Sequence, residues 1–275
     1  MLVIGIICLI VFVLVERFVS SVPFLPWKML ASRTVMGACL LDATYCVAYY
    51  CWNDYFTSWL QIEHDISIAS AGYINSIFSI VSGVWLLVVG FAIKKSGRFR
   101  WLLFCAVPLY MLGVGLMIHF REPGWPLGYS IMCQIFIAIA GGTMIIVQQV
   151  AVVSACDHNN VASALAFLNV FGSIGDGVGS SVSGAIWTHT LPAALQRLLP
   201  DDAKADWETI YDSLDVQLSY AKDTAVRRAI DLAYAEAQSR MLIAGMAVMA
   251  LSLGWMFLIR NVKLSKDVQS KGVLF

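Results

Sequence analysis

The chain has 275 residues, of which 59% are hydrophobic and 13% charged, and its mean hydropathy is +0.76. Soluble domains carry about 45–50% apolar and about 25% charged residues, so this composition excludes an ordinary soluble domain and indicates a membrane protein. The seven cysteines lie in or beside apolar runs without a Cys-x-x-Cys pair, and the four histidines are scattered. That distribution speaks against a disulfide framework or a zinc cluster. We expect no metal, no cofactor and no enzymatic activity.

The first apolar run is Leu2–Val15, which opens without a basic residue and is followed by Glu16 and Arg17. A signal peptide would begin with positive charge and end at a small-residue cleavage site. A complete span needs about 20 residues, so this run is short. We predict that residues 1–33 form a truncated transmembrane helix and a cytoplasmic linker.

Six further apolar runs are each long enough to cross a bilayer. They are Thr34–Leu60, Ala71–Ile93, Trp101–His119, Leu127–Val153, Val161–Thr188 and Met241–Ile259. The sequence therefore predicts an all-α membrane protein with six complete transmembrane helices in residues 34–260. A large outer loop at 189–240 and a cytoplasmic tail at 261–275 complete the organisation.

The segment Gly90–Arg100 assigns the sides of the membrane, because it holds four basic residues and no acid. Short basic loops stay in the cytoplasm. Counting spans from it, the inner loops hold eleven Lys and Arg against three acids, and the outer loops hold seven against twelve. This asymmetry favours the assignment over its inverse. A generic basic hairpin would explain the charges, but not Gly90 and Gly97.

The outer loop at 189–240 carries two apolar stripes at helical spacing. The first comprises Trp207, Ile210, Leu214 and Leu218, and the second comprises Val226, Ile230, Ala233 and Ala237. We predict two amphipathic helices joined near Leu218–Thr224, with a start signal at Pro200. The alternative is a solvated connector, but disordered loops rarely keep apolar stripes.

The run Val161–Thr188 places small residues on one helical face, namely Gly172, Gly175, Gly179 and Ser183. Small residues at this spacing let helices approach closely in a bilayer, so packing is the expected role. Asp176 lies within the same face, where a carboxylate needs a cavity or a partner. Proton coupling is one interpretation of Asp176, and solvent contact near a wide vestibule is the other.

Polar and aromatic residues also interrupt the second run at Trp52-Asn53-Asp54-Tyr55. Aromatic residues at this depth are either interfacial anchors or the mouth of a path for a polar ligand. Asp54 is a second candidate for proton coupling. Farther along, Gln148 and Gln149 form an amide pair that either serves a substrate or bonds neighbouring helices.

The basic segment is similar to the tight-loop signature of the major facilitator superfamily. Gly90, Gly97, Arg98 and Arg100 fit that signature, while Lys94 stands where the family usually has Asp. The resemblance implies that these four residues form a conformational loop motif.

Many other stretches, in family order, closely resemble the fungal siderophore–iron transporters of that superfamily. They include Pro23–Pro26, Trp52–Ser58, Ala71–Ile74, Gly113–Arg121, Gly141–Thr143, Gln148-Gln149, Ile186–Thr188, Leu191-Pro192, Leu218–Tyr220, Arg228–Ile230 and Ala233-Tyr234. That family has fourteen spans, and the chain resembles the last seven, the C-terminal half. The resemblance implies proton-driven uptake of ferric siderophores by alternating access, across a plasma or endosomal (vesicular) membrane, together with an N-terminal half.

On this resemblance, Trp52, Tyr55 and Tyr73 are expected to line the outer mouth of the substrate path, with Tyr220 on the loop above. Trp52 and Tyr55 are three residues apart and are expected to share one helix face. Asp42 and Asp176 stand where the family usually has small or apolar residues, so their proton-coupling roles rest on this sequence alone. The alternatives are a glutathione or drug proton antiporter of the same superfamily and a non-transporting half-transporter that acts as a binding or regulatory membrane protein.

Overall fold

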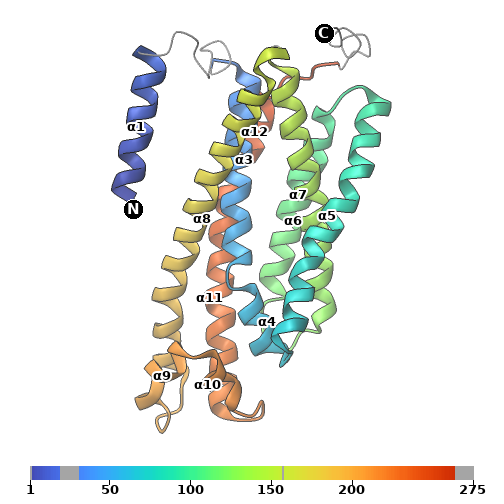
Figure 1. Cartoon of the computed structure of the whole chain (residues 1–275). Coiled ribbons are helices and arrows are strands. Elements are labelled where there is room, and N and C mark those ends of the chain that lie inside the picture. Colours follow the sequence, from blue (N-terminus) through green and yellow to red (C-terminus); the bar gives the residue numbers. More distant parts are fainter. Residues whose placement is uncertain (1, 19–30, 157, 264–275) are drawn as a thin grey trace.

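The computed structural model describes residues 2–18, 31–156 and 158–263, and all regular secondary structure in these ranges is helical (Figure 1). The α-helices are α1 Leu2–Phe18, α3 Arg33–Asn53, α4 Phe56–His64, α5 Ile68–Ser96, α6 Arg100–His119, α7 Leu127–Ser154, α8 Val161–Leu198, α9 Trp207–Asp212, α10 Leu214–Ser219, α11 Ala225–Met249 and α12 Ser252–Leu258. The predicted linker around Pro23–Pro26 and most of the predicted tail lie outside the described residues.

Six helical segments of the described chain are long and apolar enough to cross a membrane. They are Arg33–His64, Ile68–Ser96, Arg100–His119, Leu127–Ser154, Val161–Leu198 and Ala225–Leu258. The protein is therefore a multi-pass membrane protein with the predicted six complete spans. α1 is a shorter apolar helix whose described large side chains are exposed.

Two spans are not the continuous helices that the apolar runs predicted. The first breaks between α3 and α4 at Asp54 and Tyr55, and the last breaks between α11 and α12 at Ala250 and Leu251. α8 and α11 also extend well into the predicted outer loop. Their extensions pack on each other, and the guanidinium of Arg197 of α8 pairs with the carboxylate of Glu236 of α11. Just before the α8 extension begins, Trp187 meets the ring of Tyr234 of α11 edge-on, with ring centroids 5.0 Å apart.

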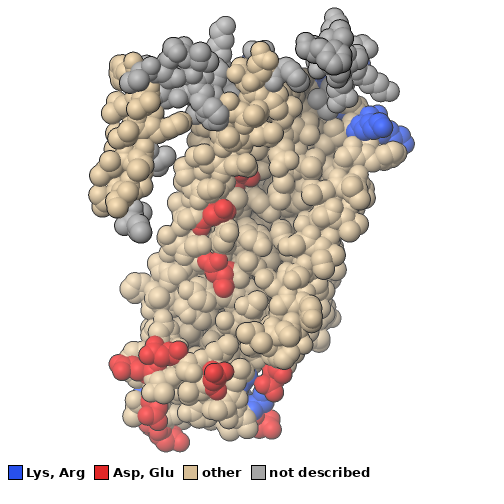
Figure 2. Space-filling model, viewed as in Figure 1, with Lys and Arg blue, Asp and Glu red and all other residues tan. Residues whose placement is uncertain are grey.

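The turns fall at two ends of the bundle, as the predicted topology requires (Figure 1). The α5–α6 turn and the C-terminal end of α12 lie at one end, and α4, α9 and α10 lie at the other. Figure 2 shows Lys and Arg at the first end and a concentration of Asp and Glu at the second. The charge asymmetry read along the sequence is thus an asymmetry of the folded molecule.

The helix α3 is the central packing element, in contact with α7, α8, α11 and α12. Glycines allow this close approach. A Cβ added to Gly175 would lie 2.5 Å from the carbonyl oxygen of Ala43, and one added to Gly179 would lie 2.9 Å from Cβ of Tyr50. Gly172, Gly175, Gly179 and Ser183 are all buried, so the predicted packing role of this small-residue face is confirmed.

The acidic end is an ordered cap built on a buried arginine. Arg227 is 1% exposed and donates to the carbonyl oxygens of Ile62 at 2.7 Å and Gln217 at 3.0 Å. Gln217 in turn accepts from the hydroxyl of Tyr234 at 2.7 Å and donates to the carbonyl of Ile210. These bonds join α4, α9, α10 and α11.

The cap differs in detail from the prediction. The first amphipathic helix is divided into α9 and α10 at Ser213, whose side chain accepts from the backbone N–H of Val216. The second stripe belongs to α11, which is continuous with the last span. The division at Ser213 is a local capping effect, because a Ser N-cap starts a new helix.

A second arginine, Arg121 in the α6–α7 turn, is fully buried. Its guanidinium lies 4.5 Å from the ring centroid of Phe56 and 4.2 Å from that of Trp59. Burial lowers the pKa of Arg121 to about 9. Cation–π contact with two rings of α4 offsets part of this desolvation and fixes α4 to the α6–α7 turn.

Candidate functional site

Three carboxylates lie along the α3–α8 face within the membrane-spanning part, far from the acidic cap. Figure 2 shows acidic side chains in the middle of this face. The two helices carry three carboxylates outside the cap: Asp42 of α3, Asp176 of α8, and Asp54 at the C-cap of α3. A carboxylate at span depth costs about 2.5–3.5 kcal/mol on insertion scales, so three of them on one face mark a polar path.

Asp54 is positioned by the break after α3. The chain leaves the helix there, and the exposed carboxylate accepts a hydrogen bond from Ser183 of α8 at 2.5 Å. The next residue, Tyr55, lies flat on Trp187 of α8, with ring centroids 4.1 Å apart and planes 5° from parallel. An acid, a hydroxyl and two stacked rings therefore come together where α3 gives way to α4.

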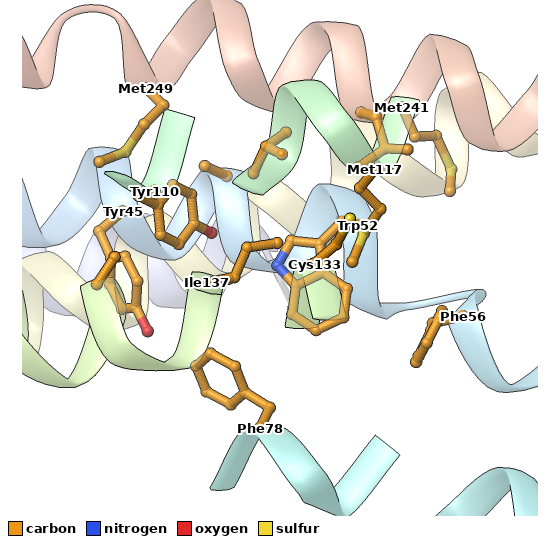
Figure 3. Close-up of a cluster of buried hydrophobic side chains, with 14 of the residues drawn as sticks. Tyr45, Trp52, Phe56, Phe78, Tyr110, Met117, Cys133, Ile137, Met241 and Met249 are labelled. Carbon is orange, nitrogen blue, oxygen red and sulfur yellow. The ribbon is translucent and has the colours of Figure 1, made fainter. Parts of the chain in front are cut away.

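Trp52 is placed differently from the prediction. Its side chain has no exposed area and packs edge-on against Tyr49, Phe56 and Phe78. Figure 3 shows it surrounded by side chains of other helices, including Met117 and Cys133. The expectation that Trp52 and Tyr55 share one helix face is wrong, because α3 ends at Asn53 between them.

Tyr73 and Tyr220 are separated from this pair. Tyr73 is 77% exposed on the first turns of α5 and makes no ring contact with the other three among the described residues. Tyr220 is half-buried at the end of α10, and its carbonyl accepts from Arg227 at 3.4 Å. The structure thus brings together Tyr55 and Asp54, while Tyr73 and Tyr220 lie on separate elements around them.

Asp176 is half-buried on α8, beside the side of that helix that packs on α3. Its neighbours on α8, Gly175 and Gly179, lie directly against α3, so Asp176 lies beside the close α3–α8 contact. Asp42 precedes Tyr50 on α3 by eight residues, and the buried Gln148 of α7 reaches its carboxylate.

The structure adds residues that sequence reasoning did not assign to the site. The sequence predicts a packing role for Ser183, and Trp187 belongs to a stretch that carries the family resemblance. The sequence signal is a polar and an aromatic residue one helical turn apart on the Asp176 face, but their partners, Asp54 and Tyr55, are about 130 residues away in sequence.

The α5–α6 turn has the backbone conformation that a glycine at its first position allows. Gly97 ends α5 with φ 63°, and its N–H donates to the carbonyl of Ile93 at 2.8 Å. Only glycine adopts that conformation without strain. Arg98 is exposed and Arg100 is half-buried over the ring of Phe104 at 5.4 Å. A Cβ at Gly90 would meet nothing within 4 Å, so no contact among the described residues requires glycine there.

Among the described residues, no group of three or more His, Cys, Asp or Glu side chains could hold a metal ion. The chemistry that the face offers is different. Carboxylates can take up and release protons, while hydroxyls, amides and aromatic rings can hold a bulky polar ligand.

Comparison with known proteins explains this arrangement. The family model of the Major Facilitator Superfamily matches residues 43–192, which is more than half of the chain. The chain belongs to the Major Facilitator Superfamily. Within this superfamily, a bacterial homologue of the human lysosomal transporter Spinster, in an inward-facing and unoccupied conformation, has a similar fold. The TM-score is 0.63 at 18% identity, over 85% of this chain and 48% of that one.

Several similar curated proteins are fungal. The chain is 70% identical over its whole length to "MFS siderochrome iron transporter D" of Aspergillus fumigatus, and 50% identical to "Siderophore iron transporter mirB" of Emericella nidulans. It is 37% identical over 86% of its length to "Siderophore iron transporter 1" of Schizosaccharomyces pombe. The predicted resemblance to fungal siderophore–iron transporters is therefore confirmed. The chain spans 46% of each of the first two relatives, about half their length.

Proposed function

We propose that this chain forms the C-terminal half of a proton-coupled transporter that takes up ferric siderophores across a fungal plasma or endosomal membrane. The observation that carries the proposal is the 70% identity, over every residue of the chain, with a siderochrome iron transporter twice as long. The polar and aromatic face along α3 and α8 supports it, because a facilitator holds its substrate between two halves. The lipid bilayer, protons and an N-terminal half are the remaining partners.

The outer mouth of the substrate path is formed around Tyr55. Ferric siderophores wrap polar ligands around the metal and present a large surface with little net charge. The stacked rings of Tyr55 and Trp187 offer a broad aromatic face beside the hydroxyl of Ser183. Trp52 supports this mouth from the core, and Tyr73 and Tyr220 contribute from α5 and from the cap.

Asp54 and Asp176 couple uptake to protons. Asp54 lies beside the mouth and Asp176 lies deeper on the same face. A proton taken up by either group removes a charge that is costly at span depth, so protonation can favour one conformation of the α3–α8 face over another.

The motif of Gly90, Gly97, Arg98 and Arg100 acts at the opposite end of the bundle. The αL turn at Gly97 holds Arg98 and Arg100 at the membrane surface. A Cβ at Gly90 would have no described neighbour within 4 Å, which leaves room for a close approach by another segment. We assign that neighbour to the N-terminal half, whose movement against this turn accompanies alternating access.

The function is tested in yeast cells that lack their own siderophore uptake. The full-length protein should accumulate iron from a radiolabelled ferric siderophore, and a protonophore should abolish accumulation. The chain of 275 residues alone, expressed to equal abundance, should not accumulate it. Uptake or efflux of glutathione or a drug in place of siderophore would favour the antiporter, and full-length protein that moves none of these would overturn transport.

A further inference from the structure

The carboxylate of Asp42 has a binding arrangement that differs from those of Asp54 and Asp176. Gln148 of α7 is 1% exposed, and one orientation of its amide satisfies both of its partners. In that orientation Nε2 donates to Oδ1 of Asp42 at 2.8 Å, and Oε1 accepts from the backbone N–H of Asp42 at 3.2 Å. A two-point contact of this kind fixes the carboxyl group in one rotamer.

The second carboxyl oxygen is directed at α8. A Cβ built on Gly172 would lie 2.7 Å from Oδ2 of Asp42, which is closer than a Cβ atom approaches a neighbouring atom in proteins. The missing side chain at Gly172 therefore provides the space for Oδ2. Gln148 occupies one oxygen, and the other is left at the α3–α8 contact.

No basic group neutralises this carboxylate among the described residues that face it. The titratable groups around Asp42 are Asp176 on α8 and Cys39, Tyr45 and Cys46 on its own helix. α7 and α12 carry no charged residue, and every charged residue of α11 precedes Met241. A negative charge at Asp42 therefore faces only another acid and neutral groups.

We propose that Asp42, held by Gln148 and accommodated by Gly172, is a third proton-carrying carboxyl inside the bundle, in addition to Asp54 and Asp176. This inference rests on the proposed proton-coupled transport. On proton uptake an O–H bond forms at Oδ2 and the side chain changes from charge −1 to neutral, and release reverses both. The neutral form removes the repulsion between Asp42 and Asp176 across the α3–α8 contact, so the proton changes the electrostatic interaction between these two helices.

Gln148 is a positioning residue in this scheme, and its neighbour supplies a matched control. Gln149 is an amide on the same helix turn but is exposed. Removing Gln148 should change the environment of the Asp42 carboxyl, whereas removing Gln149 should not.

The experiment uses the full-length transporter in two measurements. Infrared spectra recorded during a pH titration should contain a carbonyl band of a protonated carboxyl that is lost in Asp42→Asn and shifted in Gln148→Leu. The band should be unchanged in Gln149→Leu and kept in Asp176→Asn. In proteoliposomes with an imposed pH gradient, Asp42→Asn should exchange ferric siderophore across the membrane but lose all accumulation above the outside concentration.

Each outcome decides the proposal. Accumulation by Asp42→Asn equal to that of the unaltered protein, or a band that ignores both Asp42 and Gln148, overturns it. If Asp42→Asn does not fold, the shift in Gln148→Leu supports the proposal and its absence overturns it. If the unaltered protein moves no siderophore, the proposed function fails, while the infrared band still decides whether Asp42 is the proton site.

Discussion

Gly179 offers a quantitative test of how α8 lies against α3. A Cβ at this position would lie 2.9 Å from Cβ of Tyr50 and 3.0 Å from both Cα and the carbonyl oxygen of Val47. Two of these three atoms are backbone, so no rotamer change relieves the contact. Optimal contacts between carbon atoms are about 3.5–4.0 Å. The two helices must therefore separate by roughly 0.5–1 Å to accept even one methyl group.

Gly177 is the matched control on the same helix, because a Cβ there would meet nothing within 4 Å. Gly→Ala raises helix propensity by about 0.8–1.0 kcal/mol at either position, so this term cancels in the comparison. Overpacking costs about 1–3 kcal/mol. Gly179→Ala should therefore be less stable than Gly177→Ala by about 1–3 kcal/mol. Gly179→Leu should reduce the amount of folded protein in the membrane.

The measurement is the unfolding free energy of the two purified full-length variants in the same detergent, together with their abundance in the membrane. Equal stability of Gly179→Ala and Gly177→Ala would refute the close contact. Normal abundance and normal uptake of Gly179→Leu would show that this face of α8 does not pack against α3.

Four further predictions follow from the same structure. A tag inserted at Asp201 should be reachable from outside intact cells and one at the C-terminal end should not; the opposite labelling would invert the topology. Asp176→Asn should flatten the pH dependence of uptake while siderophore binding survives, and an unchanged pH profile would leave Asp176 as a solvent contact of the vestibule. Trp52→Ala should lower the free energy of unfolding by about 3–5 kcal/mol, because the indole is fully buried. Tyr55→Ala should instead weaken siderophore binding at unchanged abundance. Normal binding by Tyr55→Ala would show that Tyr55 does not line the mouth. Arg227→Met should destabilise by about 3–5 kcal/mol, seen as protease cleavage of the outer cap on intact cells, and a cap as resistant as before would show that its buried hydrogen bonds are dispensable.

Local properties of the chain were sufficient to predict the spans and the division of charge between the two ends of the bundle. Hydropathy over about 20 residues and the charge of short loops depend on neighbouring residues alone. The backbone conformation of Gly97 is also predictable from local sequence, because a glycine after the last turn of a helix commonly takes the αL conformation. The packing face of Gly175 and Gly179 was also accessible, since helical spacing puts these residues on one side whatever their partner.

Helix ends and breaks were less accessible, because packing competes with local preference. α8 continues beyond Thr188 because its extension packs on α11, and no residue near 188 predicts this longer helix. At Asp54 the opposite occurs, because the helix ends earlier than the apolar run predicts. An apolar run predicted one helix, but a polar residue at that depth has its partner, Ser183, on another helix.

The sequence by itself determined that this is a six-span helical membrane protein, that its charges are divided between two ends, and that acids and aromatic residues interrupt its apolar runs. Which of those residues meet was decided by tertiary structure. Tyr55 turns to Trp187 while Trp52 turns to the core, and Asp42 meets Gln148 across more than a hundred residues. The physical reason is that side-chain direction follows from helix breaks and helix contacts, and both are set by packing between segments distant in the chain.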